Sequence, residues 1–90
     1  MSTDPTLQRY RDEIAALDRQ LVEIVNARLA AVVELHRYKG EQGLPVRDPE
    51  RERWLVEHLQ GENAGPLTAE GVAELVEFVL ELIRKEQARG

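Results

Sequence analysis

The sequence predicts an all-α fold with three helices per chain, one of them very long, in an intertwined helical homodimer. Apolar residues recur at alternating steps of three and four, as in a packed helix, and no stretch shows the strict alternation of a β-strand. Asp-Pro pairs and a threonine mark helix starts, and Gly and Pro mark the breaks between helices. The 90 residues are expected to form one domain, residues 1–90.

The first helix is expected to begin near Asp4 and Pro5 and to run to Tyr38–Gly40, where Gly40 and Gly43, then Pro45, end it. About 35 helical residues give a length of about 50 Å, whereas a compact globule of this size has a radius of gyration of about 12 Å. Such a helix cannot fold back within its own domain, so its apolar seam needs a partner, most simply a second copy of the chain. The seam positions are Leu7, Tyr10, Ile14, Leu17, Leu21, Ile24, Arg28, Ala31, Leu35 and Tyr38.

The second helix is expected to start with Asp48 as N-cap and Pro49 in its first turn, and to end at about Leu59 or Gln60. Three residues of this helix form its apolar side. They are Trp54, Leu55 and Leu59.

The third helix is expected to begin after a Thr68 N-cap and to continue to about Arg89. A loop rich in Gly and Pro separates it from the second helix. The predicted loop residues are Gly61, Gly65 and Pro66. A broad apolar face on this helix should pack against its neighbours. That face consists of Val72, Leu75, Val76, Val79, Leu80, Leu82 and Ile83.

Composition excludes several classes of protein. The chain has no cysteine, so disulfides and thiolate chemistry are excluded and a cytoplasmic location is expected. A net charge of −5 argues against a general nucleic-acid binder, and no apolar run is long enough to predict a membrane span. Ser2 is the only serine, and the sequence has no phosphate-binding glycine loop and no metal-ligand spacing, so no cofactor is expected.

Arg28 places a permanent cation in the apolar seam, where it needs a carboxylate from the protein or from a ligand. The alternative is a register-setting residue paired with a glutamate. Lys39 lies about three turns later on nearly the same side, about 16 Å away, so the two side chains could reach one small ligand. The alternative is that Lys39 simply complements the helix dipole. Arg11 lies about 25 Å before Arg28 along the helix, too far to share a small ligand within one chain. In an antiparallel dimer it could approach the middle of the other chain. The alternative is that Arg11 is a solvated charge.

Polar residues also fall on the apolar sides of the other two helices. Asp48, Arg51 and Glu52 share one side of the second helix, so Arg51 and Glu52 are expected to lean toward the core. Gln87 follows Ile83 by four residues at the end of the third helix. The alternatives are an N-cap role for Asp48, a surface ladder for Arg51 and Glu52, and an exposed Gln87.

The remaining charged residues look like parts of the solvated surface. These are Arg9, Arg19, Arg37, Arg53 and Arg84, together with His36 and His58. What is left is a set of cations, one carboxylate and one amide in an aliphatic setting. This set favours a reaction driven by positioning and electrostatic stabilisation, on a small substrate with more than one carboxylate.

Residues 21–28, 38–40 and 45–53 (LVEIVNAR, YKG and PVRDPERER) closely resemble the all-helical class of chorismate mutase. The resemblance implies an intertwined dimer of three-helix chains that catalyses the Claisen rearrangement of chorismate to prephenate without a cofactor. It implies that Arg28, and Arg11 of the other chain, hold the two substrate carboxylates. It further implies that Lys39 and Gln87 donate to the breaking ether oxygen.

At the ring end of the substrate, the resemblance implies that Glu52 accepts the ring hydroxyl with help from the backbone near Asp48. Arg51 would help to close the site. Many relatives carry a small hydroxyl residue near a substrate carboxylate where this chain has Ile83.

Two other functions fit the same scaffold. One is an isochorismate pyruvate lyase. Two sequence features favour the mutase over this lyase: Glu52 next to Arg51, and the segment Pro45–Asp48 that leads into the second helix. The other is a non-catalytic or regulatory helical dimer. The resemblance also implies a possible activating partner, the enzyme that opens the aromatic pathway.

Overall fold

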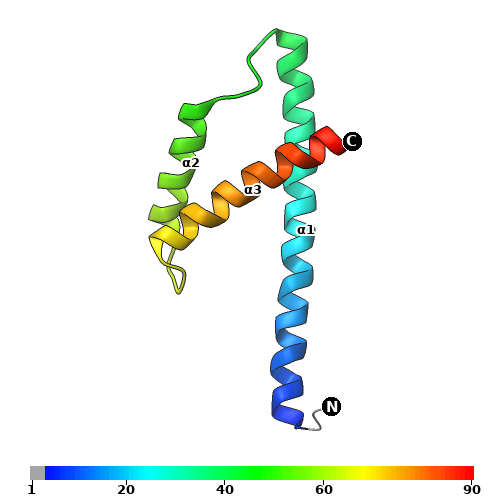
Figure 1. Ribbon diagram of the computed structural model, residues 1–90, viewed down its shortest axis with the longest axis vertical. Coiled ribbons are helices and arrows are strands. Elements are labelled where there is room, and N and C mark those ends of the chain that lie inside the picture. The colour runs from blue at the N-terminus through cyan, green and yellow to red at the C-terminus, as the bar shows by residue number, and fades with distance from the viewer. Residues whose placement is uncertain (1–3) are drawn as a thin grey trace. The chain divides into compact units, whose positions relative to one another are not determined.

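A computed structural model describes residues 4–90 as three α-helices, and this part of the chain contains no strand (Figure 1). The helices are α1 (Pro5–Gln42), α2 (Pro49–Glu62) and α3 (Ala69–Arg89), which confirms the predicted all-α class. The chain divides into two compact units, one ending at Val32 and one spanning Val33–Gly90. Among the described residues, no helix combines the length and the apolar character that a membrane span requires.

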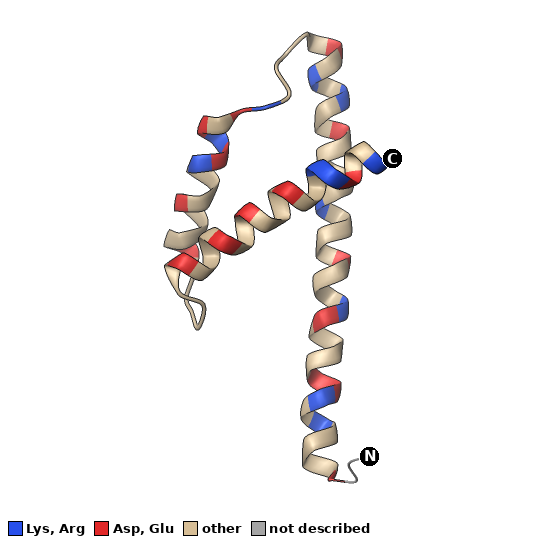
Figure 2. Cartoon of the chain, in the orientation of Figure 1, with Lys and Arg blue, Asp and Glu red and all other residues tan. Residues whose placement is uncertain are grey.

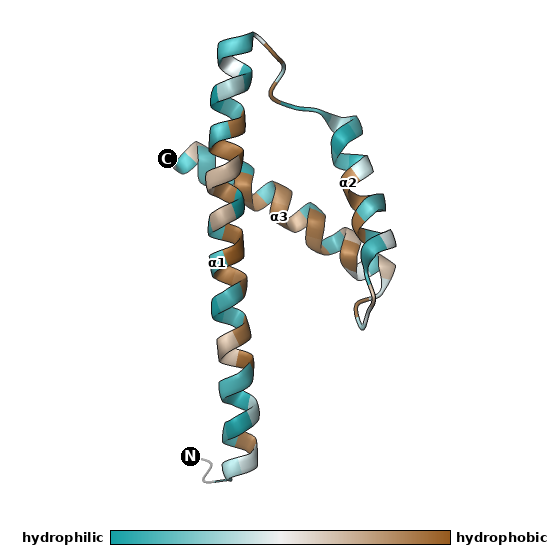
Figure 3. Cartoon of the chain, turned by 180° about the vertical axis from the view of Figure 1, so that it is seen from behind, coloured by the Kyte–Doolittle hydropathy of each residue, from teal (hydrophilic) through white to brown (hydrophobic). Residues whose placement is uncertain are grey.

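The start of α1 is fixed by Asp4, whose Oδ1 accepts hydrogen bonds from the backbone N–H groups of Thr6 (2.9 Å) and Leu7 (3.3 Å). This is the predicted N-cap, and it satisfies two of the donors that a helix start leaves free. Apolar residues recur along α1 (Figure 3), yet none of its residues is buried. Leu17 and Ile24 remain 61% and 64% exposed, so a single chain leaves the seam uncovered.

The end of α1 is set by Gly43, one of the predicted helix breakers, and the helix passes through Gly40. Gly43 has φ +68°, the left-handed conformation in which glycine is favoured. The N–H of Leu44 donates to the Lys39 carbonyl (2.8 Å), and the N–H of Gly43 donates to the Gly40 carbonyl (3.3 Å). This is a Schellman motif. Gly43 is thus confirmed as a predicted helix breaker. The prediction was wrong for Gly40, and α1 runs about half a turn past it, because a helix accepts a glycine in its interior at modest cost.

These two glycines should respond in opposite ways to alanine. Gly43→Ala forces a Cβ into the left-handed region and is expected to lower the free energy of unfolding by about 1–2 kcal/mol. Gly40→Ala meets no heavy atom within 4 Å and is expected to raise it by about 0.5–1 kcal/mol. Thermal or urea denaturation at one protein concentration measures both. Equal effects of the two substitutions would contradict the assigned helix end.

In the second unit, α2 packs against α3 (Figure 1). The buried residues among those described are Val72, Val76 and Ile83, all on α3. The amide Nε2 of Gln60 donates to the Ala69 carbonyl (2.9 Å), which ties the end of α2 to the start of α3. The prediction that Gly61 belongs to the loop was wrong, because α2 continues to Glu62.

The short connection between α2 and α3 is held by its own side chains. Asn63 Nδ2 donates to the Leu67 carbonyl (2.7 Å), and Asn63 Oδ1 accepts from the Gly65 N–H (3.1 Å). Thr68 Oγ1 accepts from the Gly71 N–H (3.0 Å), as predicted for the N-cap of α3. These contacts set where α3 begins and therefore which of its residues face α2.

Candidate active site

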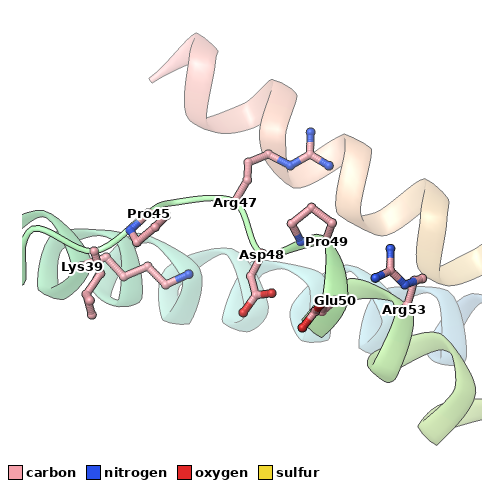
Figure 4. Close-up of a pocket in the computed structure, with 8 residues that line it drawn as sticks. Lys39, Pro45, Arg47, Asp48, Pro49, Glu50 and Arg53 are labelled. Carbon is pink, nitrogen blue, oxygen red and sulfur yellow. The ribbon is translucent and has the colours of Figure 1, made fainter.

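A pocket lies where the chain passes from the end of α1 to the start of α2 (Figure 4). Its volume of about 650 Å³ is in the range of small-molecule sites. Three cations and two carboxylates lie among its lining residues, beside a leucine and two prolines, so charged groups and apolar surface both face a ligand. The lining residues are Lys39, Leu44, Pro45, Arg47, Asp48, Pro49, Glu50 and Arg53.

Lys39 is fixed to this pocket from two directions. Its carbonyl accepts the Leu44 N–H in the Schellman motif, and its ammonium Nζ donates to the Val46 carbonyl at 3.0 Å. Figure 4 shows the Lys39 amine and the Asp48 carboxylate on the same side of the loop, with the Arg47 side chain directed away from them. Because an ammonium has three donors, two remain for a ligand.

Asp48 has the predicted N-cap role, since its Oδ1 accepts from the backbone N–H of Arg51 (3.1 Å). The expectation that Arg51 leans toward the core was wrong. Its guanidinium lies over the exposed Trp54 ring, 3.9 Å from the centroid, and Trp54 stacks in turn on His58. Cation–π attraction outside the core explains this position.

Glu52 lies half-buried between two arginines, which places it as predicted on the inner side of α2. Arg47 approaches both of its carboxylate oxygens at 3.4 Å, and Arg84 of α3 approaches Oε1 at 3.5 Å. Figure 2 shows α3 changing from acidic to basic toward its C-terminal end, and Arg84 is its first basic residue. Reading Arg84 as a solvated charge was therefore wrong, because it also bridges Glu81 and is only 37% exposed.

Gln87 is half-buried near the end of α3, and its Nε2 lies 2.7 Å from Nδ1 of His36. His36 is half-buried as well, so reading it as a surface residue was wrong. Ile83, four residues before Gln87, is buried and belongs to the core.

Arg11 and Arg28 belong to the first unit. Arg11 is exposed and Arg28 is half-buried. Within residues 4–32, neither forms an ion pair with a carboxylate of its own helix. Within this part of the chain, no carboxylate of α1 therefore supplies the negative charge that the Arg28 guanidinium requires.

The structure brings predicted site residues of the second unit together in three groups: Lys39 with Asp48 in the pocket, Glu52 with its arginines, and Gln87 with His36. Arg47 belongs to both of the first two, since it lines the pocket and contacts Glu52. Sequence reasoning assigned no role to Arg47 or His36. His36 precedes Lys39 by three residues, a spacing that places both on one helix face and could have revealed it.

Comparison with known families decides the relationship. Residues 10–88 match the family model described as chorismate mutase type II. The chain belongs to the chorismate mutase type II family. The matched residues include every predicted site residue from Arg11 to Gln87, and the resemblance expected from the sequence is confirmed.

Individual relatives agree with this membership. The chain is 35% identical over 88 residues to the T-protein of Haemophilus influenzae, covering 96% of this chain and 22% of that protein. It is 39% identical over 51 residues to the 4-amino-4-deoxychorismate mutase of Streptomyces venezuelae, covering 57% and 50%. The solved chorismate mutase (form II) of Thermus thermophilus superimposes with a TM-score of 0.86, at 28% identity, over 93% of this chain and 96% of that one. The chain thus spans about a fifth of the T-protein and half of the Streptomyces protein.

Proposed function

We propose that this protein is a chorismate mutase, which rearranges chorismate to prephenate in the cytoplasm as a step of aromatic amino-acid biosynthesis. One observation carries the proposal: within the residues matched to the family, the Val46 carbonyl holds the Lys39 ammonium at a ligand-sized pocket. Residues 1–90 would form a single catalytic domain. The type II family match and the three cations that line the pocket support this reading.

The proposed reaction is an intramolecular Claisen rearrangement. The ether C–O bond breaks while a new C–C bond forms, so no group is transferred to the protein and no proton has to move. Lys39 and Gln87 would donate hydrogen bonds to the ether oxygen as negative charge grows on it. Arg28, with Arg11 of the second chain, would bind the carboxylates and hold the side chain over the ring.

Glu52 would accept the ring hydroxyl, with the backbone near Asp48 assisting and Arg51 ordering the site. The contacts from Arg47 and Arg84 leave Glu52 with unused lone pairs, because a carboxylate has about four acceptor positions. Ile83 cannot donate a hydrogen bond, so the side chain at this position would give no polar contact to a substrate carboxylate. Cations elsewhere in the site would carry that binding.

We infer that the functional form is an intertwined homodimer with active sites shared between chains. The exposed apolar seam of α1 supports this, because most of the stability of a helix in a protein comes from packing its apolar face. The unpaired Arg28 within residues 4–32 supports a ligand or a second chain as the source of its counter-charge. An activating partner enzyme would act on this dimer.

Products identify the reaction. Purified protein is given chorismate and isochorismate separately, and the products are resolved by chromatography. Prephenate from chorismate supports the mutase. Pyruvate released from isochorismate, with no turnover of chorismate, would establish the lyase instead. No turnover of either substrate would favour a non-catalytic dimer.

The arginines around Glu52 predict discrimination at the ring substituent. A protonated ring amine, as in 4-amino-4-deoxychorismate, adds a cation beside Arg47 and Arg84, whereas a hydroxyl does not. Arg84→Leu is expected to shift the ratio of kcat/KM toward the amine by about 1.4- to 5-fold, as about 0.2–1 kcal/mol for a partly exposed pair implies. Lys85→Leu, the exposed neighbour, is the control. An unchanged ratio in Arg84→Leu would contradict this role.

A further inference from the structure

A hydrogen bond joins the last turns of α1 to the last turns of α3. Gln87 Nε2 lies 2.7 Å from His36 Nδ1, across 51 residues of sequence, and both side chains are half-buried. Both residues lie in the unit Val33–Gly90. The contact is therefore a property of one compact unit.

The chemistry of the two groups fixes the direction of this bond. A primary amide nitrogen can only donate, so His36 Nδ1 accepts and the neutral imidazole carries its proton on Nε2. The bond uses one of the two N–H groups of Gln87. The amide cannot rotate without losing it, so the direction of the second N–H is also set.

His36 also stands next to the other proposed donor. It precedes Lys39 by three residues, so the two side chains leave the same face of α1. Lys39 is held by the Val46 carbonyl, and His36 holds Gln87. One end of α1 thus carries one proposed donor, Lys39, and the residue that contacts the other, Gln87.

We propose that His36 is a positioning residue that orients the Gln87 amide toward the breaking ether oxygen. This inference rests on the proposed mutase function. An oriented donor stabilises the transition state more than the bound substrate, because charge develops on the ether oxygen only as the bond breaks. Loss of His36 should therefore lower kcat and leave KM nearly unchanged.

The test compares two substitutions of His36. His36→Leu removes the acceptor and is expected to lower kcat about 10-fold or more. This loss should be smaller than the loss in kcat of about 10²–10³ that is expected when a donor itself is removed. His36→Asn places an amide oxygen close to the Nδ1 position and should recover most of the kcat. Arg37→Leu, at the exposed neighbour of His36, is the control and should leave kcat and KM unchanged. Equal kcat values for His36→Leu and wild type would overturn the proposal.

A double-mutant cycle shows whether His36 acts through Gln87. In the Gln87→Ala background, His36→Leu should have little further effect on kcat, because the group that it orients is gone. If the two losses simply multiply, His36 does not act by orienting Gln87 and the proposal is wrong.

Nitrogen NMR of the wild-type protein provides a readout that does not depend on activity. The proton of His36 is expected on Nε2, and the Nδ1 signal should shift in Gln87→Ala. A proton on Nδ1 would overturn the proposal even if the protein is active. If the NMR result is as expected but the protein forms no prephenate, the proposed function fails and the positioning role in that reaction fails with it.

Discussion

Lys39→Ala is expected to lower kcat for prephenate formation by about 10²–10³, the usual cost of removing one donor from a developing oxyanion. The reason is the position of the ammonium, which is held in the pocket while two of its three donors remain available. Steady-state kinetics with chorismate measure the effect. Because the lost contact strengthens in the transition state, kcat should fall more than KM rises.

Two further variants separate the charge from its structural contact. Lys39→Gln keeps an N–H donor for the Val46 carbonyl but carries no charge, and it should remain impaired. Lys85→Ala removes an exposed lysine of α3 and should retain full activity. Wild-type activity in Lys39→Gln would mean that Lys39 only tethers the loop.

Arg28→Leu is expected to lower kcat/KM by about 10²-fold, because hydrogen bonds to a charged group contribute about 1.5–3 kcal/mol. The variant should remain dimeric, with an unchanged or higher melting temperature. Arg28 is a half-buried cation that forms no ion pair within residues 4–32, whereas leucine is the residue type that an apolar helix seam favours. The substitution should therefore not lower the stability. Kinetics, sedimentation and thermal denaturation at one protein concentration measure the three quantities.

Arg19→Leu is the matched control, since Arg19 lies on the same helix but is exposed. Its kcat/KM should stay close to wild type. A monomeric or strongly destabilised Arg28→Leu would contradict a ligand-binding role and would assign Arg28 to the register of the dimer.

Local sequence signals predicted most of the fold. Asp4, Asp48 and Thr68 are N-caps as expected, because an N-cap is a contact between residues two or three apart. The ends of helices were harder to predict. Gly40 and Gly61 both lie inside helices, since the cost of a helical glycine is small enough for neighbouring contacts to outweigh it.

The candidate site was predicted less completely because its contacts join distant residues. Lys39 and Asp48 come from one short segment, and the structure places both in one pocket. Arg84 meets Glu52 only through the register of α3 against α2, which depends on the turn around Asn63. The pairing of His36 with Gln87 likewise requires the three-dimensional arrangement of the second unit.

We propose that a complete mutase site needs Arg28 from one chain and Arg11 from the other. Arg11→Ala and Arg28→Leu chains, each nearly inactive alone, are unfolded together, refolded and assayed for prephenate. Random pairing makes half of the dimers mixed, each with one intact site, so the mixture should recover roughly a quarter of wild-type activity. A mixture no more active than its components would contradict the shared site.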